Sequence, residues 1–434
     1  MLACSRRLLW AQTSLSAPIR PPTLSSDPAS CDGRMRGSPV MSPATQPTTE
    51  FAAARLLSLD ILRLLAVVMV IGHHMERTPT DLSPVAKAVL DAWWSHGGLG
   101  VDLFFVLSGL LVSGLLFSEY KKHGEISVPR FYLRRGWKIY PAFYFMLGFT
   151  WLYQLLVAGY KMRDRPFFSE LFFIQSYQAG FWNHTWTLAV EEHFYLLLPL
   201  FLLALTRWRR GAADPFRAVP YFVAAACVVV LVGRIINFQV RDDYSYITHV
   251  FPTHLRIDAL FFGVAIGYLY HFHCDSFCNT FRPWRYALIA AGAALMFGSL
   301  LVGSPSDKYI HTFGFTQHYL GAAAIIVGAL LCHFPRNRLT TILATLGSYS
   351  YSIYLWHMAI FYWATPHMRA AGFSWSLRQA IFFGGAFVIG ITMAKLIELP
   401  TLRLRDRLFP SRTASPILAS SPVPTADPSA RQAA

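Results

Sequence analysis

Charged residues are scarce in this chain of 434 residues. Asp, Glu, Lys and Arg together make up 14% of the sequence, whereas a soluble globular domain usually carries about 25%. Hydrophobic residues account for 54% and aromatic residues for 15%. This balance excludes an ordinary soluble domain and predicts an integral membrane protein.

Cysteine is also scarce, and the few cysteines are scattered. Two of the six lie within apolar runs, so the sequence predicts no disulfide framework. Cys274 and Cys278 stand beside His271 and His273, but their spacing does not fit a zinc site well. We therefore expect no metal and interpret this stretch as a loop at a membrane interface. The six are Cys4, Cys31, Cys227, Cys274, Cys278 and Cys332.

Acidic residues are fewer than basic ones, since 23 Asp and Glu stand against 38 Lys and Arg, which leaves a formal net charge of +15. In a soluble protein this charge would suggest nucleic acid as a partner. Here the basic residues lie mainly between apolar runs, where they set membrane topology. We expect no nucleic-acid partner, whereas a polyanionic ligand such as coenzyme A agrees with the charge.

Both ends of the chain lack apolar periodicity. Residues 1–54 are rich in Pro, Ser, Thr and Ala, and residues 406–434 in Pro, Ser and Ala. Such compositions are typical of disordered segments. We expect disorder in both, on either side of one transmembrane domain over 55–405. Met41 is an alternative start of the chain.

Ten apolar runs fill the region between these ends. Each is close to the roughly 20 residues that an α-helix needs to cross a bilayer, and none shows the alternation of a membrane β-strand. The sequence therefore predicts an all-α integral membrane bundle of about ten transmembrane helices. The runs lie near 57–75, 98–118, 139–159, 186–206, 218–236, 251–271, 285–303, 316–334, 341–363 and 376–396.

Basic residues between the runs indicate an orientation. Alternate loops are rich in Lys and Arg, which favours the cytoplasmic side for those loops and for both termini. The even number of spans agrees with this topology. The basic loops contain Lys121, Lys122, Arg130, Arg134, Arg135, Lys138, Arg207, Arg209, Arg210, Arg217, Arg282, Arg336 and Arg338.

The first run, LDILRLLAVVMVIGHHM, carries ionisable groups at membrane depth. Each costs at least ~2.5–3.5 kcal/mol to insert, so such residues are functional candidates by default. His74 follows Arg63 by eleven residues, which is three helical turns plus about 20°. Both side chains should therefore leave one helix face, roughly 16 Å apart along the axis. The alternative is that Asp60, Arg63 and the histidines snorkel at the two ends.

Four later runs carry further charged or titratable groups. Asp102 lies in GVDLFF, Glu191 and Glu192 in LAVEEHFYLL, Arg256 in THLRIDALFF and His357 in YLWHMAIF. The adjacent glutamates should point about 100° apart, so that one of them faces the bundle interior. The alternatives are interhelix ion pairs for the carboxylates and an ordinary hydrogen-bonded interior histidine for His357.

Basic side chains crowd the cytoplasmic entrance of the third helix in the segment VPRFYLRRGWKIYP. Arg134 and Lys138 are one turn apart and share a helix face. Groups of this kind could hold the phosphates of an acyl-CoA. The alternative is that they only follow the positive-inside rule.

Six motifs together resemble the acyltransferase 3 family, membrane enzymes that O-acylate bacterial surface glycans and some secreted metabolites. They occur in the family's order over residues 57–400. Thr187 stands where the family usually has Ser, and His193 where it often has Gln. The motifs are LDILRLLAVVMVIGHHM, GVDLFFVLSGLLV, FYLRRGWKIYP, TWTLAVEEHFYLLLP, RIDALFFGVAIG and LGSYSYSIYLWH.

The resemblance implies roles for these residues. His74, Glu191 and Arg63 would be catalytic, and Arg134, Arg135 and Lys138 would bind acyl-CoA. The chain would hold no bound cofactor and would use acetyl-CoA or another acyl-CoA as co-substrate. His74 would take the proton of the acceptor hydroxyl or briefly carry the acyl group, with Glu191 or Asp102 orienting its imidazole. Supporting residues would be Asp60, Asp102, Glu192, Arg256 and His357.

The acceptor implied by the resemblance is a glycan or a glycosylated small molecule, such as exopolysaccharide, O-antigen or a lipid-linked sugar. The expected location is a bacterial inner membrane, with lipid and polysaccharide-assembly proteins as neighbours. Many family members carry an additional hydrolase-like domain with no counterpart here, so we expect the membrane domain to act alone or with a partner. The alternatives are a transporter or flippase for a glycan or metabolite, and a non-enzymatic assembly protein.

Overall fold

The computed structural model describes residues 49–156, 164–241, 244–299 and 308–412, and these ranges contain helices and no strand. The first half comprises α1 (Thr49–His73), α2 (Pro84–His96), α3 (Leu99–His123), α4 (Val128–Leu156), α5 (Asp164–Leu171), α6 (Trp186–Trp208), α7 (Val219–Val240) and α8 (Tyr246–His249). The second half comprises α9 (Ile257–Phe272), α10 (Cys274–Phe281), α11 (Arg285–Gly298), α12 (Phe315–Leu331), α13 (Arg338–Ser348), α14 (Ser350–Ala359), α15 (Thr365–Ala370), α16 (Trp375–Met393) and α17 (Leu399–Leu408).

The all-α prediction is confirmed for the described residues, and several helices are long and apolar enough to span a membrane. Length and composition qualify five of them, or six if α9 and the helices after it form one span despite a bend of 108°. The other expected runs also fall on helices, namely α1, α4, α9, α11 and the pair α13 and α14. The five are Leu99–His123, Asn183–Trp208, Val219–Val240, Ile310–Leu331 and Trp375–Leu408.

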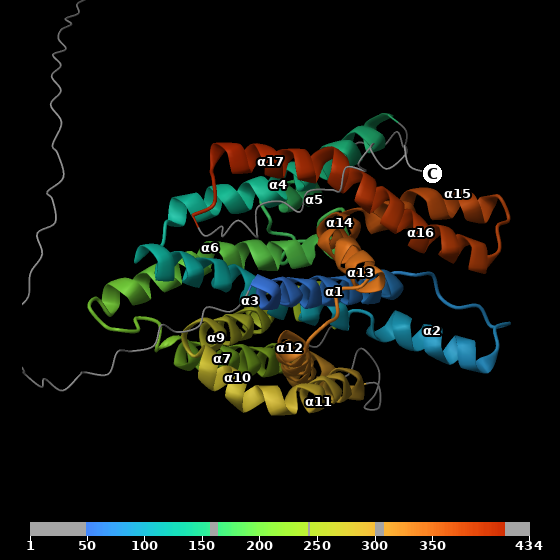
Figure 1. The fold of residues 1–434 in the computed structure, drawn as a ribbon. Helices are drawn as coiled ribbons and strands as arrows, with labels where there is room; N and C mark the ends of the chain where they lie inside the picture. Colours follow the sequence, from blue (N-terminus) through green and yellow to red (C-terminus); the bar gives the residue numbers. More distant parts are fainter. Residues whose placement is uncertain (1–48, 157–163, 242–243, 300–307, 413–434) are drawn as a thin grey trace, which may run out of the picture. The chain divides into compact units, whose positions relative to one another are not determined.

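Helix α3 lies at the centre of the packing (Figure 1). It contacts α1, α6, α9 and α12. Of the residues in its apolar stretch, 78% are buried inside the protein, against 22% for α7. The crossing of α3 with α9 depends on two glycines. A Cβ on Gly109 would lie 1.9 Å from the Leu260 carbonyl oxygen, and one on Gly263 would lie 2.3 Å from that of Val106. The lack of a side chain at Gly109 and Gly263 thus permits this close approach.

The ninth apolar run forms two helices instead of one. Tyr349 separates α13 from α14, with φ −90° and ψ 3°. Gly347 packs against α1, where a Cβ would meet the carbonyl of Asp60, whereas α14 packs on α16. The two halves of the run therefore pack mainly against different helices, α13 against α1 and α14 against α16.

Helical structure extends into both segments that were expected to be disordered. Helix α1 begins at Thr49, and α17 continues to Leu408 along α4 (Figure 1). Asp406 on α17 pairs with Arg134 on α4, with 2.9 Å between nitrogen and oxygen. This contact holds the chain close to α4 beyond residue 405. Residues 1–48 and 413–434 lie outside the described residues.

Candidate active site

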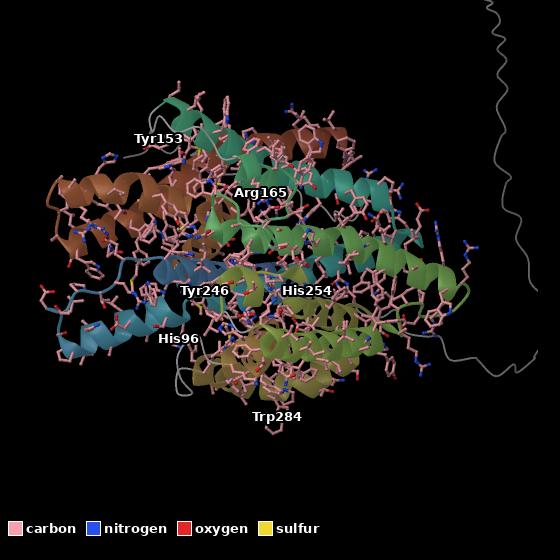
Figure 2. The ribbon with its side chains drawn as sticks, turned by 180° about the vertical axis from the view of Figure 1, so that it is seen from behind. His96, Tyr153, Arg165, Tyr246, His254 and Trp284 are labelled. Atoms are coloured by element: carbon pink, nitrogen blue, oxygen red, sulfur yellow. The ribbon has the colours of Figure 1, made fainter. Side chains whose placement is uncertain are left out.

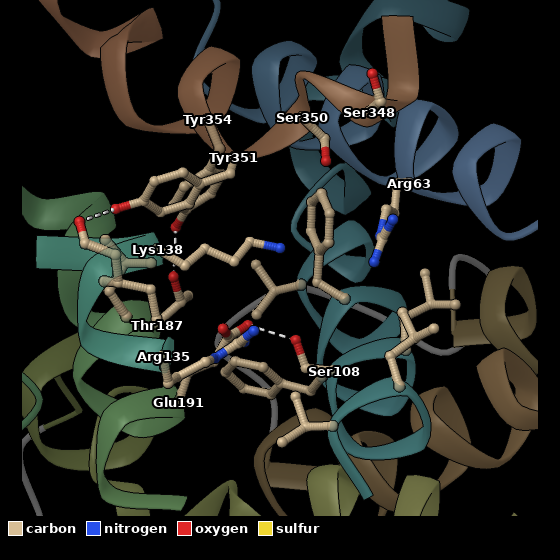
Figure 3. A pocket seen from close by; sticks show the side chains of 18 of the residues that line it. Arg63, Ser108, Arg135, Lys138, Thr187, Glu191, Ser348, Ser350, Tyr351 and Tyr354 are labelled. Carbon is tan, nitrogen blue, oxygen red and sulfur yellow. Dashed lines mark hydrogen bonds between the residues drawn. The ribbon is translucent and has the colours of Figure 1, made fainter. Parts of the chain in front are cut away.

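Two cavities lie along α1. The first, of about 130 Å³, is lined by Arg63, Arg135 and Lys138 together with Glu191 and apolar side chains, and we call it the basic cavity (Figure 3). The second, of about 510 Å³, we call the histidine cavity. Six of its lining residues are His73, His74, His96, His184, His311 and His318. Val101 of α3 and Tyr354 of α14 line both cavities.

The basic cavity gathers several of the expected donor-binding residues. Arg63 pairs with Asp60 at 2.5 Å, and the guanidinium carbon of Arg135 lies 4.0 Å from the centre of the Tyr195 ring. Lys138 points toward the interior of the cavity in Figure 3, and it makes no hydrogen bond or ion pair with another described residue. The cavity thus offers positive charge that the protein neutralises in part.

Arg134 is not part of this group. It lies outside the described lining of both cavities and binds the C-terminal helix instead, through Asp406 and the carbonyl of Phe409. Lys138 follows Arg134 by four positions, so the two share a side of α4, but only Lys138 lines the cavity. Of the three residues expected to bind acyl-CoA, Arg135 and Lys138 therefore line the basic cavity, whereas Arg134 does not.

Glu191 and Glu192 face different surroundings. Glu191 lines the basic cavity and accepts hydrogen bonds from Ser108 at 3.0 Å and from Tyr195 at 2.5 Å. Glu192 accepts a bond at 3.0 Å from Tyr140 of α4. The separation agrees with the 100° between successive helical residues.

His74 is held by another histidine. Its Nδ1 lies 2.9 Å from the carbonyl of Val70 and 3.4 Å from Nε2 of His357. Nδ1 of His357 lies 2.6 Å from the carbonyl of Tyr354. A carbonyl can only accept, so these partners assign the proton to Nδ1 in both rings. Nε2 of His74 is then unprotonated, as a general base requires.

The carboxylates expected to orient His74 lie elsewhere. Glu191 lines the other cavity. Asp102 lines the histidine cavity but pairs with Arg256 at 2.8 Å, and both side chains are nearly fully buried. The expectation that Glu191 or Asp102 orients the imidazole is therefore corrected to His357. An unpaired Arg256 at this depth would be costly, which accounts for the position of Asp102.

Two further histidines of the cavity were not singled out from the sequence. His184 donates from Nε2 to the carbonyl of Leu355 at 3.2 Å, and its ring lies 4.9 Å from that of His357. Both nitrogens of buried His318 lack a hydrogen-bond partner within the described residues, and Nδ1 lies 3.9 Å from Asp102. No group of described side chains is arranged to hold a metal ion.

Comparison with known proteins gives this arrangement a family. A family model described as an acyltransferase domain, that of the acyltransferase 3 family, matches residues 56–396. The chain belongs to the acyltransferase 3 family. The matched region includes every residue of the two cavities except Glu398, which ends the π-helical turn after α16. No solved structure matches the chain.

Two relatives of this acyltransferase 3 protein carry O-acetyltransferase names. The chain is 24% identical over 376 residues to the peptidoglycan O-acetyltransferase OatA of Listeria monocytogenes, a match that covers 81% of this chain and 57% of the relative. It is 27% identical over 330 residues to O-acetyltransferase OatA of Staphylococcus aureus, covering 70% of this chain and 50% of the relative. The chain therefore spans about half the length of these relatives.

A signal for His184 and His318 was present in this acyltransferase 3 sequence. His184 precedes the helix that bears the two glutamates, and His318 interrupts an apolar run in FTQHYL. Inserting a histidine at membrane depth costs free energy, so such a histidine is a functional candidate by default. The residues that His184 and His318 contact could not be predicted, however, because the packing of distant helices decides which residues meet.

Proposed function

We propose that this protein is a membrane O-acyltransferase that moves an acetyl or other short acyl group from acyl-CoA to a hydroxyl of a carbohydrate. The observation that carries the proposal is the pair of adjoining cavities. One presents Arg63, Arg135 and Lys138, and the other presents His74. Cationic groups suit the phosphates of the donor, and an unprotonated imidazole suits the acceptor hydroxyl.

The donor enters from the cytoplasm in this proposal. The basic cavity lies near the Lys- and Arg-rich start of α4, which the positive-inside rule assigns to that side. The same rule favours a cytoplasmic position for both termini, and the proposal includes a bundle of about ten spans in the inner membrane of a bacterium. Arg135 and Lys138 hold the phosphates, while Arg134 stands outside the cavity in its ion pair with Asp406.

The acceptor occupies the histidine cavity. Its volume of about 510 Å³ is in the range of small-molecule sites. Trp186 and Phe251 stack in its wall with 4.9 Å between ring centres, and Tyr246 and His96 complete an aromatic and polar lining (Figure 2). Flat rings beside hydrogen-bonding groups suit a sugar, which has apolar C–H faces and hydroxyl edges. The peptidoglycan named for the Listeria relative is such a carbohydrate polymer.

The chemistry is a direct exchange of an oxygen ester for a thioester. Nε2 of His74 takes the proton of the acceptor hydroxyl, and the oxygen forms a bond to the acyl carbon. The carbon–sulfur bond then breaks, and the leaving thiolate receives the proton from His74 as free coenzyme A forms. Arg63 lines the basic cavity and stabilises negative charge on the donor. A general base of this kind contributes about 10²–10⁴-fold to the rate.

The test measures ester-linked acetate on surface glycans of a strain that lacks the protein. We expect wild type to restore the acetate and His74→Ala to restore none, although it reaches the membrane in equal amount. His367→Ala is the matched control, because His367 is exposed on α15 and lies outside the described lining of both cavities. Full acetylation by His74→Ala would refute the mechanism. Unchanged acetate in every strain, without acyl-CoA turnover in membranes, would favour a transporter or flippase.

A further inference from the structure

The wall between the two cavities consists of few side chains. Val101 and Tyr354 line both cavities, from α3 and α14 respectively. If acyl-CoA occupies one cavity and the acceptor the other, as proposed above, the acyl carbon must meet the hydroxyl at this wall. The size of the opening there then limits the acyl groups that can react.

Tyr354 is the rigid side of the wall. Its hydroxyl donates to the carbonyl of His184 at 2.5 Å and lies 2.7 Å from the hydroxyl of Thr187 (Figure 3). The backbone carbonyl of Tyr354 accepts a hydrogen bond from Nδ1 of His357. Nε2 of His357 in turn contacts Nδ1 of His74. Rotation of the tyrosine ring would break both hydrogen bonds of the tyrosine hydroxyl, which would cost free energy. The ring therefore stays in place.

Val101 is the residue of this wall whose substitution would change the size of the opening between the cavities. The backbone of α3 is pressed against α1 here, since a Cβ on neighbouring Gly100 would lie 2.4 Å from the carbonyl of Ala66. The next residue, Asp102, is fixed by Arg256. A β-branched side chain on such a backbone has few rotamers, so the two methyl groups of Val101 keep their positions relative to α3.

The side chains around this wall in the basic cavity are apolar. Phe104, Phe105 and Leu188 line the cavity with Val101, whereas Arg63 and Lys138 supply its charge. An acyl chain would lie among the apolar residues while the phosphates meet the cations. The cavity holds about 130 Å³, which favours a short acyl group over a long one.

We propose that Val101, which lines both cavities together with Tyr354, determines the maximum length of the acyl group that this protein transfers. This inference rests on the proposed function. Removing the methyl groups of Val101 opens room for additional methylenes of the donor, and a larger side chain removes room. An apolar site discriminates a single methylene by about 10–200-fold, so the change in preference should be easy to measure.

The test supplies acetyl-, propionyl- and butyryl-CoA in equal amounts to membrane vesicles from a host that lacks its own copy. Base-released acids are then quantified by chromatography. We expect Val101→Ala to raise the butyrate-to-acetate ratio by roughly ten-fold or more, and Val101→Leu to lower the propionate-to-acetate ratio. Val106→Ala is the matched control. It is the same substitution on the same helix, and buried Val106 lies outside the described lining of both cavities.

The outcomes separate the inference from the function on which it rests. If wild type esterifies none of the three acids, the proposed function fails. If wild type transfers acetyl groups but Val101→Ala and Val101→Leu keep its ratios, or Val106→Ala changes them equally, the role of Val101 is wrong. Val101→Thr, which has nearly the same shape, should keep the wild-type ratios. If Val101→Ala does not accumulate in the membrane, Val101→Leu and Val101→Thr decide the question.

Discussion

Nε2 of His357 lies 3.4 Å from Nδ1 of His74, although 283 residues separate the two in sequence. His357 is fully buried and is fixed through its other nitrogen by the carbonyl of Tyr354. The pair resembles a base and its orienting partner, with an imidazole in the position where many hydrolases have a carboxylate. A neutral partner avoids placing an additional negative charge in the bundle.

The first prediction concerns this partner. His357→Ala should lower kcat by roughly 10- to 100-fold, because a base displaced by about 1 Å loses most of its advantage. KM for acetyl-CoA should stay nearly unchanged, since His357 lies outside the described lining of the basic cavity. His357→Gln, whose amide oxygen can accept from Nδ1 of His74, should recover part of the rate. A rise in KM without a fall in kcat would contradict this positioning role.

The second prediction concerns the basic residues of α4. Lys138→Met should raise KM for acetyl-CoA by roughly ten-fold or more, because a charged hydrogen bond contributes about 1.5–3 kcal/mol. Arg134→Met should raise it less, since Arg134 already pairs with Asp406 and lies outside the cavity. Initial rates at varied acetyl-CoA test both. An equal or larger effect of Arg134→Met would mean that the C-terminal contact opens when the donor binds.

The third prediction concerns the crossing of α3 and α9. Gly109→Ala should lower the thermal unfolding midpoint in detergent clearly, since the new Cβ would lie 1.9 Å from the Leu260 carbonyl and overpacking costs about 1–3 kcal/mol or more. Gly148→Ala is the control on α4, where no heavy atom lies within 4 Å of a Cβ. It should hold or raise the midpoint, because alanine favours helix by about 1 kcal/mol. Equal behaviour of the two variants would argue against the close crossing.

The fourth prediction concerns Glu76, which follows α1 outside the apolar run. Burial alone would raise the pKa of this carboxyl, but hydrogen bonds from Arg369 and Arg378 outweigh burial and hold the pKa below its ordinary value of 4.5. A lowered folded pKa adds stability that is complete above pH 4.5 and is lost as the pH falls through the folded value. The unfolding midpoint of wild type should therefore decrease as the pH falls below about 4.5.

Glu76→Gln gives the comparison for this prediction. The variant should unfold at a lower temperature at pH 7, because Arg378 and Gln379 lose a charged acceptor. Its midpoint should also change less than that of wild type between pH 5 and pH 3, a window chosen around the carboxyl pKa. Parallel curves for the two proteins would show that other carboxyls govern the acid transition.

Much of the site could be predicted from individual helices. The spacing of Arg63 and His74 implied one helix face and a separation of roughly 16 Å, and the two residues line adjoining cavities. The spacing of Glu191 and Glu192 implied that they face apart, as they do. These inferences succeed because helical geometry alone decides them.

Relations between helices could not be predicted in this way. The contact of His357 with His74 depends on how α14 packs, and α14 exists as a separate helix because the chain breaks at Tyr349. Arg134 was grouped with Lys138 by spacing, but a residue beyond 405 competes for it. Such outcomes depend on packing partners that lie far away in the sequence.

The wall formed by Val101 and Tyr354 makes the two cavities unable to respond independently. A molecule in one cavity would contact the same two side chains as a molecule in the other, so occupancy of one cavity would alter affinity in the other. Thermodynamics makes this influence reciprocal: a donor that favours the acceptor is favoured by it to the same degree. In a protein with such a shared wall, each bound substrate would change the affinity for the other, and no domain would have to move.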